Sequence, residues 1–431
     1  MRFFYTLILL TLSAVSFAQV DVHSPDALLR YADKQAPQVL QSKLIPEMAK
    51  QDVNIQASGL YPRVNVFGAG DYYPIIATQV IPAEVLGGAP GTYLKAQFGL
   101  PYVFAAGAEL TMPVVNLEKW TQLSKSRTIY NQSKWTGKAS LESFHVQLIQ
   151  AYYQTLVTKE VLSLNDENVT TVAELKRIME ERYNNGVVNP ADYNRTTNLY
   201  MDVQSAGYNY KKQLQQSYNA LSAMLNLNND SLMLSENIIE FNWPLLQHVN
   251  DPTNRSAWKE ADYKLQAAEL SLSESRKGGL PRLSLTGRYT YNMQSKFEVA
   301  GNNVEFNTAN VGMRVDFPLF QGNYYRSLQH KSKLQLENAK LEQQRTQATL
   351  TQQQSDWYAQ YQAAFSKHNV LNEKVKNASD NLRIAKLNLK EGVMEFDEFN
   401  NIFTEYNRAR MENLQNLADG ILYYLLSTQK F

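Results

Sequence analysis

The sequence predicts a mixed α/β membrane protein that is built from a duplicated unit of helices and strands. Three observations carry this prediction: a motif that occurs twice, short segments in which apolar and polar residues alternate, and two proline-free stretches suited to very long helices. Each copy of the unit is predicted to run in the order helix, strand, long loop, strand, very long helix, glycine turn and helix.

The N-terminus has the pattern of a secretory signal peptide. Arg2 gives a basic start, an apolar run follows, and Ser16-Phe17-Ala18 forms a small-x-small cleavage site, so we predict a signal peptide over residues 1–18. A retained membrane anchor is the alternative, which the shortness of the run disfavours. Because no other run approaches the length of a spanning helix, the mature chain would have to cross a membrane as β-strands.

Composition argues against several functional classes. The 42 basic and 41 acidic residues nearly cancel, which leaves no charge signature for a nucleic-acid partner, and the chain has no cysteine for a disulfide, a metal site or a nucleophile. The five histidines are scattered, and no HExxH, GxSxG, Walker A or GxGxxG pattern occurs. We therefore expect no enzyme, no cofactor and no metal site.

The repeated motif defines the two copies. "SGLYPRVNVFGAGDYY" aligns with "GGLPRLSLTGRYTYN", so that Pro62-Arg63 matches Pro281-Arg282. Proline disfavours helix in the preceding residue, which places the end of a helix and the start of a strand at each motif, with both arginines at the membrane rim. The predicted organisation is a first repeat over 19–225, a linker over 226–256 and a second repeat over 257–431.

Each repeat contains two predicted strands, and the four cover residues 62–73, 103–116, 281–297 and 306–320. The third shows the alternation best, with Leu283, Leu285 and Tyr289 on one face and polar residues between them. The pattern fits either a soluble sheet with a core or a membrane barrel with lipid outside. A barrel needs about eight strands to close, so several chains would have to share one.

Each repeat also contains one very long predicted helix, followed by a glycine turn and a second helix. The segments 117–182 and 323–390 contain no proline, and helices over 191–225 and 396–428 follow them. A seven-residue spacing of apolar residues, from Leu350 through Ala364 to Ala385, predicts a coiled-coil seam. Helices of this length, on the order of 100 Å, suit a rod or a tube. An ordinary long coiled coil is the alternative.

Three stretches carry a resemblance to a known family: "DVNIQASGLYPRVNV" from Asp52, "AELSLSESRKGGLPRLSL" from Ala268, and "NNGVVNPADYNRTTNL" from Asn184. In this order, and with the duplication, the chain resembles the TolC-like outer-membrane efflux and type I secretion channels. The resemblance implies a homotrimer whose chains each give four strands to a shared 12-stranded transmembrane β-barrel. It also implies a long periplasmic α-helical barrel with an equatorial domain, for which residues 21–37, 226–256 and the C-terminus are candidates.

The resemblance further implies a function and a location. Channels of this kind lie in the outer membrane with a long periplasmic extension, in contact with outer-membrane lipid. They passively conduct drugs, small molecules or proteins to the exterior, from a periplasmic adaptor protein and an inner-membrane transporter. The alternative interpretation is a periplasmic coiled-coil structural or adaptor protein with a small soluble β-domain.

The two glycine turns are candidate gate regions by the same resemblance, which implies acidic residues just past the second turn that can ring the entrance. A family position that is often acidic is Asn401 here, and a position that is often arginine is Met394 here. The alternative is that the acidic residues only stabilise helix N-termini. The candidate tip residues are Gly186, Asp192, Gly392, Glu395, Asp397 and Glu398.

A set of aromatic residues in and beside the predicted strands could form a membrane-interface girdle, which is typical of outer-membrane strands. The alternative is packing inside a soluble sandwich. The candidate girdle residues are Tyr72, Tyr73, Tyr289, Tyr291, Phe317, Phe320, Tyr324 and Tyr325.

Overall fold

The computed structural model describes residues 20–228, 232–238, 241–246, 251–296 and 303–428, so the predicted signal peptide lies outside the described residues. The chain divides into two compact units. Unit 1 is formed by the chain up to Pro46, by Lys134–Glu260 and by the chain from Gln344, and unit 2 by Glu47–Ser133 and Ala261–Gln343. Each unit therefore contains segments from both predicted repeats.

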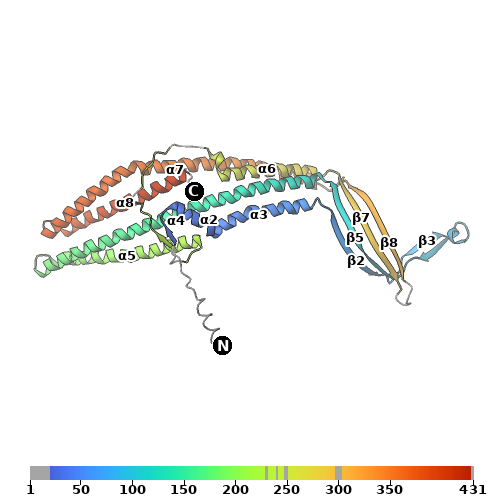
Figure 1. Cartoon of the computed structure of the whole chain (residues 1–431), viewed down its shortest axis with the longest axis horizontal. Coiled ribbons are helices and arrows are strands. Elements are labelled where there is room, and N and C mark those ends of the chain that lie inside the picture. Colours follow the sequence, from blue (N-terminus) through green and yellow to red (C-terminus); the bar gives the residue numbers. More distant parts are fainter. Residues whose placement is uncertain (1–19, 229–231, 239–240, 247–250, 297–302, 429–431) are drawn as a thin grey trace, which may run out of the picture. The chain divides into compact units, whose positions relative to one another are not determined.

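Unit 2 contains an antiparallel four-stranded sheet (Figure 1). The strands lie in the order β2 (Arg63–Tyr72), β5 (Tyr102–Val115), β7 (Arg282–Ser295) and β8 (Val304–Asp316). Strand β8 ends at Asp316, four residues before the predicted end, because its neighbour β7 begins at Arg282, which pairs with Asp316. Two strands from each repeat thus form one sheet.

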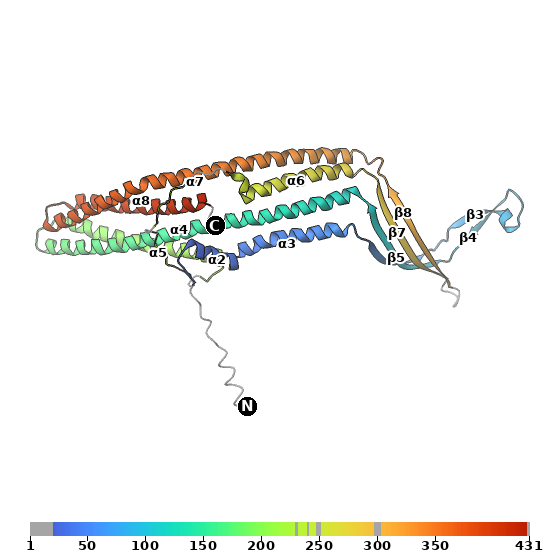
Figure 2. The same ribbon diagram turned by 45° about the horizontal axis from the view of Figure 1, so that its top comes forward.

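A smaller hairpin lies between β2 and β5, in a segment without predicted strands (Figure 2). It consists of β3 (Thr78–Pro82), a short 3-10 turn and β4 (Tyr93–Gln97). Gly87 and Gly91 have positive φ at its tip, a backbone conformation that glycine adopts without steric cost.

Four helices have residues in both units, namely α3 (Pro37–Ser58), α4 (Leu117–Asn184), α6 (Ser256–Lys277) and α7 (Tyr324–Glu391). In unit 2 they lie side by side in this order, and each joins one strand of the sheet (Figures 1 and 2). The helices are tied by ion pairs: Lys125 of α4 lies 2.5 Å from Glu274 of α6, and Lys264 of α6 lies 2.7 Å from Glu342 of α7.

Unit 1 contains two helical hairpins. The first joins α4 to α5 (Pro190–Leu225), and the second joins α7 to α8 (Phe396–Thr428). Most of the predicted seam residues of α7 are buried, including Ala364 and Ala385, whereas Trp357 is half-buried. Asn416 of α8 donates to the Ala364 carbonyl at 3.0 Å. Small residues at the seam allow this close approach of α7 and α8.

Short elements pack against the hairpins in unit 1. Strand β1 (Val20–Val22) pairs in parallel with β6 (Leu232–Leu234), which joins two of the candidate equatorial segments. Helix α2 (Pro25–Gln35) begins after Ser24, whose hydroxyl accepts from the backbone N–H of Ala27 and so caps the helix.

A buried carboxylate lies beside these elements. Tyr152 and Tyr153 of α4 donate hydrogen bonds to Glu236, at 2.6 and 3.3 Å. Burial raises the pKa of Glu236 and outweighs the two tyrosine hydrogen bonds, which lower it. Burial also raises the pKa values of both tyrosines, so their hydroxyls remain donors.

Residues 241–246, here called the strap, lie across α7 and α8. The Trp243 ring centre lies 4.7 Å from that of His368 and 6.1 Å from that of Tyr361, and Tyr361 donates to the Pro244 carbonyl at 2.5 Å. A Cβ atom at Gly420 of α8 would run into the Trp243 indole, so this glycine makes room for the strap.

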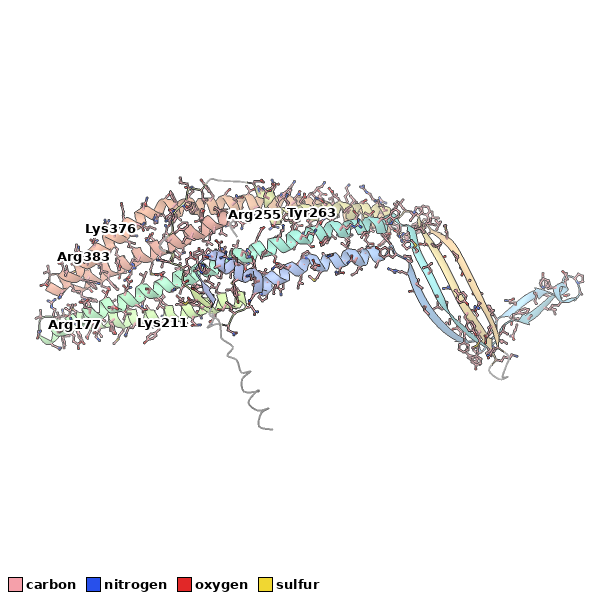
Figure 3. All side chains as sticks on the ribbon, in the orientation of Figure 1. Arg177, Lys211, Arg255, Tyr263, Lys376 and Arg383 are labelled. Atoms are coloured by element: carbon pink, nitrogen blue, oxygen red, sulfur yellow. The ribbon has the colours of Figure 1, made fainter. Side chains whose placement is uncertain are left out.

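The helices carry many charged side chains on their exposed faces, such as Arg177, Lys211, Lys376 and Arg383 (Figure 3). Among the described helices, none combines the length and the apolar character needed to cross a membrane.

Candidate functional site: the sheet, its junction with the helices and the hairpin turns

One face of the four-stranded sheet is apolar. Val64, Leu110, Gly287 and Val311 pair in one row across the strands, and the adjacent row contains Val66, Ala108, Tyr289 and Ala309. The side chains of Val66 and Val311 are 83% and 82% exposed in the single chain. An exposed apolar face on this scale marks a surface that another apolar phase or partner covers.

The opposite face is polar. Its corresponding row contains Asn65, Glu109, Arg288 and Asn310. Arg288 lies 2.9 Å from the Glu109 carboxylate and 5.3 Å above the Phe67 ring, so its charge is paired and its guanidinium is stacked. The alternation predicted from the sequence therefore separates an apolar face from a face suited to water.

The junction between helices and strands is held by two cations, which bind equivalent glycine carbonyls of the two repeats. The Arg282 guanidinium donates to the Gly278 carbonyl at 3.0 Å, and the Lys119 ammonium donates to the Gly59 carbonyl at 3.0 Å. Arg282 also pairs with Glu118 of α4 at 2.6 Å. These bonds satisfy carbonyl groups at the helix C-termini and fix the angle at which each strand leaves its helix.

The four predicted junction residues lie between a helix and a strand. Strands β2 and β7 begin at Arg63 and Arg282, directly after Pro62 and Pro281. The role of Arg282 differs from that of a simple rim charge, because its ion pair with Glu118 joins two elements. Arg63 is exposed at the start of its strand.

Most of the predicted aromatic residues lie towards the two ends of the strands, but Tyr289 and Tyr291 lie in the middle of β7. Tyr72 stacks on Tyr102 at 4.7 Å at the end of β2, whereas Phe317, Phe320 and Tyr324 are exposed near the junction. The ten residues of β2 would span about 33 Å, close to the thickness of a hydrocarbon core. Tyr73, Tyr289 and Tyr291 are exposed, and Tyr325 is half-buried.

Both hairpin turns require glycine for their backbone conformation, and the second also requires it because a side chain would have no room. Gly186 has φ 72° and Gly392 has φ 80°, in the left-handed region. A Cβ atom at Gly186 would enter open space, but one at Gly392 would meet the Arg182 guanidinium. Arg182 donates to the Leu389 carbonyl at 2.8 Å and so ties the first hairpin to the second.

Two of the predicted acidic residues are brought together by a cation that sequence reasoning missed. Arg195 of α5 lies 3.0 Å from Asp397 and 3.6 Å from Asp192. The Asp192 carboxylate also accepts from the Asn189 side chain at 2.7 Å. The spacing of three residues between Asp192 and Arg195 was a signal for their pairing on one helix face, but nothing local indicated Asp397.

Glu395 and Glu398 are exposed beside this group, and within the described chain neither has an ion-pair partner. Asp397 and Glu398 occupy the first turn of α8, where a negative charge also stabilises the helix dipole. The positions of Asp397 and Glu398 are therefore compatible with a gate role and with a helix-stabilising role, and both roles stay predictions. Within the part of the chain that the structure describes, no group of His, Asp and Glu is arranged to hold a metal ion.

Solved structures of other proteins have the same fold as this chain. A membrane protein from Pseudomonas aeruginosa matches with a TM-score of 0.72 and 16% identity, over 94% of this chain and 92% of that one. The outer membrane protein VceC from Vibrio cholerae matches with 0.74 and 12%, over 94% and 95%. The Campylobacter jejuni CmeC outer membrane channel matches with 0.71 and 16%, over 94% and 85%.

Among curated proteins, no sequence matches this chain. The family model for outer membrane efflux proteins matches residues 28–227 and 253–419, which is most of the chain. This match confirms the predicted efflux channel of the outer membrane rather than the alternative of a periplasmic coiled-coil adaptor. The chain belongs to the outer membrane efflux protein family.

Proposed function

We propose that three copies of this chain form the exit duct of a tripartite efflux pump, in which each copy gives its four-stranded sheet to one shared 12-stranded barrel. The observation that carries the proposal is the sheet itself. It has an apolar exposed face and a polar face, and in the described chain β2 and β8 each have a neighbour on one side only. Pairing β8 of one copy with β2 of the next would satisfy both edges.

The duct acts passively and performs no catalysis. It has no nucleotide-binding motif to supply energy, so an energised inner-membrane transporter and a periplasmic adaptor deliver the drugs, small molecules or proteins that pass through it. The turns at Gly186 and Gly392 are the proposed place of contact with the adaptor. Glu395, Glu398 and the Arg195-bridged pair Asp192 and Asp397 would form the entrance ring in the trimer.

The aromatic residues at the two ends of the strands support a girdle at each membrane interface. Tyr72 and Tyr73 lie at one end, and Phe317, Phe320 and Tyr324 lie near the junction with the helices. Aromatic rings favour the headgroup level because they are apolar with a polar edge or hydroxyl.

Cysteine labelling tests the proposal, because the native chain contains no cysteine. In intact membranes, Val66→Cys and Val311→Cys on the apolar face should resist a water-soluble maleimide, since lipid covers them. Asn65→Cys and Asn310→Cys, one residue away on the polar face, should react from the lumen. The protein should also stay in the membrane fraction after a carbonate wash.

The matched pairs separate membrane insertion from general inaccessibility. After solubilisation in denaturant all four variants should react equally. Equal labelling of both faces in intact membranes, or release of the protein by carbonate, would contradict the proposal. A purified protein that gives no conductance in planar bilayers would contradict the duct function itself.

A further inference from the structure

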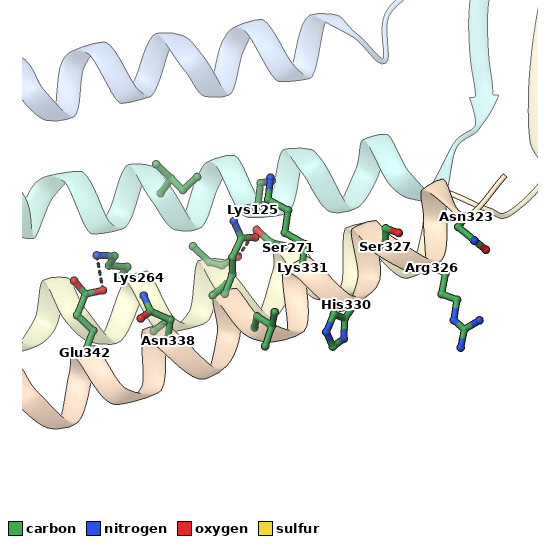
Figure 4. A pocket seen from close by; sticks show the side chains of 16 residues that line it. Lys125, Lys264, Ser271, Asn323, Arg326, Ser327, His330, Lys331, Asn338 and Glu342 are labelled. Atoms are coloured by element: carbon green, nitrogen blue, oxygen red, sulfur yellow. Dashed lines mark hydrogen bonds and ion pairs between the residues drawn. The ribbon is translucent and has the colours of Figure 1, made fainter. Parts of the chain in front are cut away.

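Unit 2 contains hollows of two different kinds. One, of about 1080 Å³, lies along α4, α6 and α7, and its lining includes the ion pair between Lys264 and Glu342 (Figure 4). Helix α7 follows the edge strand β8, so the next copy in the proposed barrel would lie against it. Another hollow, here called the rim pocket, has a volume of about 350 Å³ and lies where helices meet the sheet. The residues that line the rim pocket include Arg63, Thr111, Lys119, Arg282, Ser284 and Asp316.

The strand residues of the rim pocket belong to the polar face of the sheet. Residues an even number of positions apart on a strand share a face. Arg63 is two residues from Asn65 of the polar row, its partner Thr111 lies on the next strand, and Ser284 is four residues from Arg288. In the proposed barrel this face is directed to the lumen. Neighbouring copies would join the sheet at the edges of β2 and β8, and so would not cover this face.

The rim pocket has more positive than negative charge. Arg282 is paired with Glu118 at 2.6 Å, and Asp316 is paired with an arginine of its own strand at 3.0 Å. Arg63 and Lys119 have no carboxylate partner among the described residues. An anion in the rim pocket would therefore meet two uncompensated cations and no unpaired carboxylate of the described lining.

The rim pocket also contains hydrogen-bond donors without acceptors. The Nε–H group of Arg282 is buried and has no partner within the described chain. An ammonium group has three N–H donors, and in the described chain that of Lys119 donates to the Gly59 carbonyl at 3.0 Å. Because buried donors nearly always have a partner, the Arg282 group indicates an acceptor that comes from outside the chain.

We propose that the rim pocket binds a small tetrahedral oxyanion of the phosphate type, taken from the aqueous lumen. Arg63 and Lys119 would neutralise its charge, and the Nε–H group of Arg282 would donate to one of its oxygen atoms. The volume of the rim pocket leaves room for water around such an ion. In a trimer, the three sites would concentrate anionic compounds at one level of the lumen. This last statement rests on the proposed function, whereas the site itself lies within one chain.

Isothermal titration calorimetry with inorganic phosphate tests the site, on the full chain in phosphatidylcholine nanodiscs at constant ionic strength. The wild type should bind phosphate saturably. Arg63→Gln should raise the Kd about tenfold and Arg63→Lys should raise it less, because only the first removes the charge. The matched control is Arg288→Gln, which removes a charge of the same face outside the rim pocket and should change the Kd less than twofold.

Charge-selective labelling reports on the rim pocket without calorimetry. The native chain has no cysteine, so Ser284→Cys places a single thiol in the rim pocket and Asn310→Cys places one on the same face outside it. Rates of an anionic and a cationic methanethiosulfonate are compared after correction for their rates with a free thiol. The preference for the anionic reagent should be about tenfold greater at Ser284→Cys than at Asn310→Cys. Phosphate should slow the anionic reagent severalfold at Ser284→Cys only.

Several results would overturn the inference. The absence of saturable phosphate binding by the wild type would show that water alone satisfies the Arg282 donor. Equal effects of Arg63→Gln and Arg288→Gln on the Kd, or the same reagent preference at both cysteines, would show only a general potential of the lumen. A Ser284→Cys thiol that reacts only after denaturation would show that the rim pocket is closed to the lumen. Displacement of phosphate by phosphatidylglycerol in the nanodiscs would assign the site to a lipid headgroup instead of an aqueous ion.

The inference and the proposed function can fail separately, because neither measurement requires conduction. A conducting protein whose rim pocket binds no phosphate contradicts only the site. A protein that binds phosphate at the rim pocket and gives no conductance in planar bilayers contradicts only the duct.

Discussion

Arg195 lies among the acidic residues near the hairpin turns. It lies within 3.0 Å of Asp397 and 3.6 Å of Asp192, so it compensates part of their negative charge. Glu395 and Glu398 have no such partner within the described residues. Because the Arg195 pairs are largely exposed, each contributes about 0–1 kcal/mol to stability, and their main effect is on the local potential.

This arrangement predicts opposite effects of two neutral substitutions. Arg195→Gln should increase cation selectivity, because it uncovers the charges of Asp192 and Asp397, whereas Glu398→Gln should decrease it. The measurement is the reversal potential of single channels in a salt gradient. Arg383→Gln makes the same charge change on α7 and should have a smaller effect. An unchanged reversal potential in both test variants would remove the proposed acidic ring.

Glu236 couples the stability of unit 1 to pH. Its pKa is raised by burial, so the folded state keeps the proton at a pH where the unfolded chain has lost it. The stabilisation from this group is therefore complete below the ordinary glutamate pKa and is lost as pH rises through the raised value. The neutral carboxyl still accepts from Tyr152, so protonation does not remove that bond.

Glu236→Gln should remove this pH dependence. Relative to the wild type, the variant should become more stable as the pH rises from about 4.5 to 8, because only the wild type has to bury a charge. Thermal unfolding midpoints across this range provide the measurement, with the exposed Glu47→Gln as the control. A difference that is constant with pH, or that changes in the opposite direction, would contradict the prediction.

At the scale of elements, the strap packs against helices α7 and α8, and the sequence alone did not predict this contact. The Trp243 ring packs against His368 and Tyr361 of α7 and occupies the space beside Gly420 of α8. A glycine inside a helix normally costs about 1 kcal/mol relative to alanine. Its presence at Gly420 follows from the indole ring, not from the helix.

A double-mutant cycle tests this packing. Gly420→Ala should destabilise the wild type, because the new methyl group displaces the strap. In a Trp243→Ala background the same change should stabilise α8 by about 0.5–1 kcal/mol, through helix propensity alone. Trp243→Ala by itself should cost roughly 2 kcal/mol, since the ring is half-buried. Thermal unfolding and the rate of tryptic cleavage in the linker report the effects, and additive values would refute the coupling.

Elements with a strong periodicity could be predicted from the sequence, whereas elements without one could not. The seam of α7 and the alternation of β7 repeat over many residues, so their existence was evident. Strands β1 and β6 have three residues each, too few to show a period, and their parallel pairing joins residues more than 200 positions apart. Strands β3 and β4 lie in a loop with scattered apolar residues, in which apolar and polar residues do not clearly alternate.

At the scale of the whole molecule, the ordered set of motifs indicated the family although no single motif was decisive. The site was predictable only in part. Gly186, Gly392 and the acidic residues follow from turn chemistry and resemblance, but Arg195 pairs with Asp397 across 202 positions. The packing of the two hairpins brings these two residues together, and no local pattern in the sequence indicates that packing.

Assembly through the sheet edges can be tested by cross-linking. Asn65→Cys on β2 combined with Thr308→Cys, Asn310→Cys or Arg314→Cys on β8 should form a disulfide between copies at one register. Paired strands bring opposite Cα atoms to about 4.5–5.5 Å, which is within the range of about 4.4–6.8 Å that a disulfide spans. Non-reducing gels should show a ladder that ends at three chains. Each single variant should remain uncross-linked through this route, and a ladder that ends at two or continues past three would exclude the trimer.

The apolar face and the free edges of the sheet also have a consequence for how the protein is made. A newly exported copy presents Val66, Val311 and two open strand edges to an aqueous compartment before any partner has arrived. Such surfaces template aggregation. We therefore expect biogenesis to need factors that shield the sheet until the copies assemble.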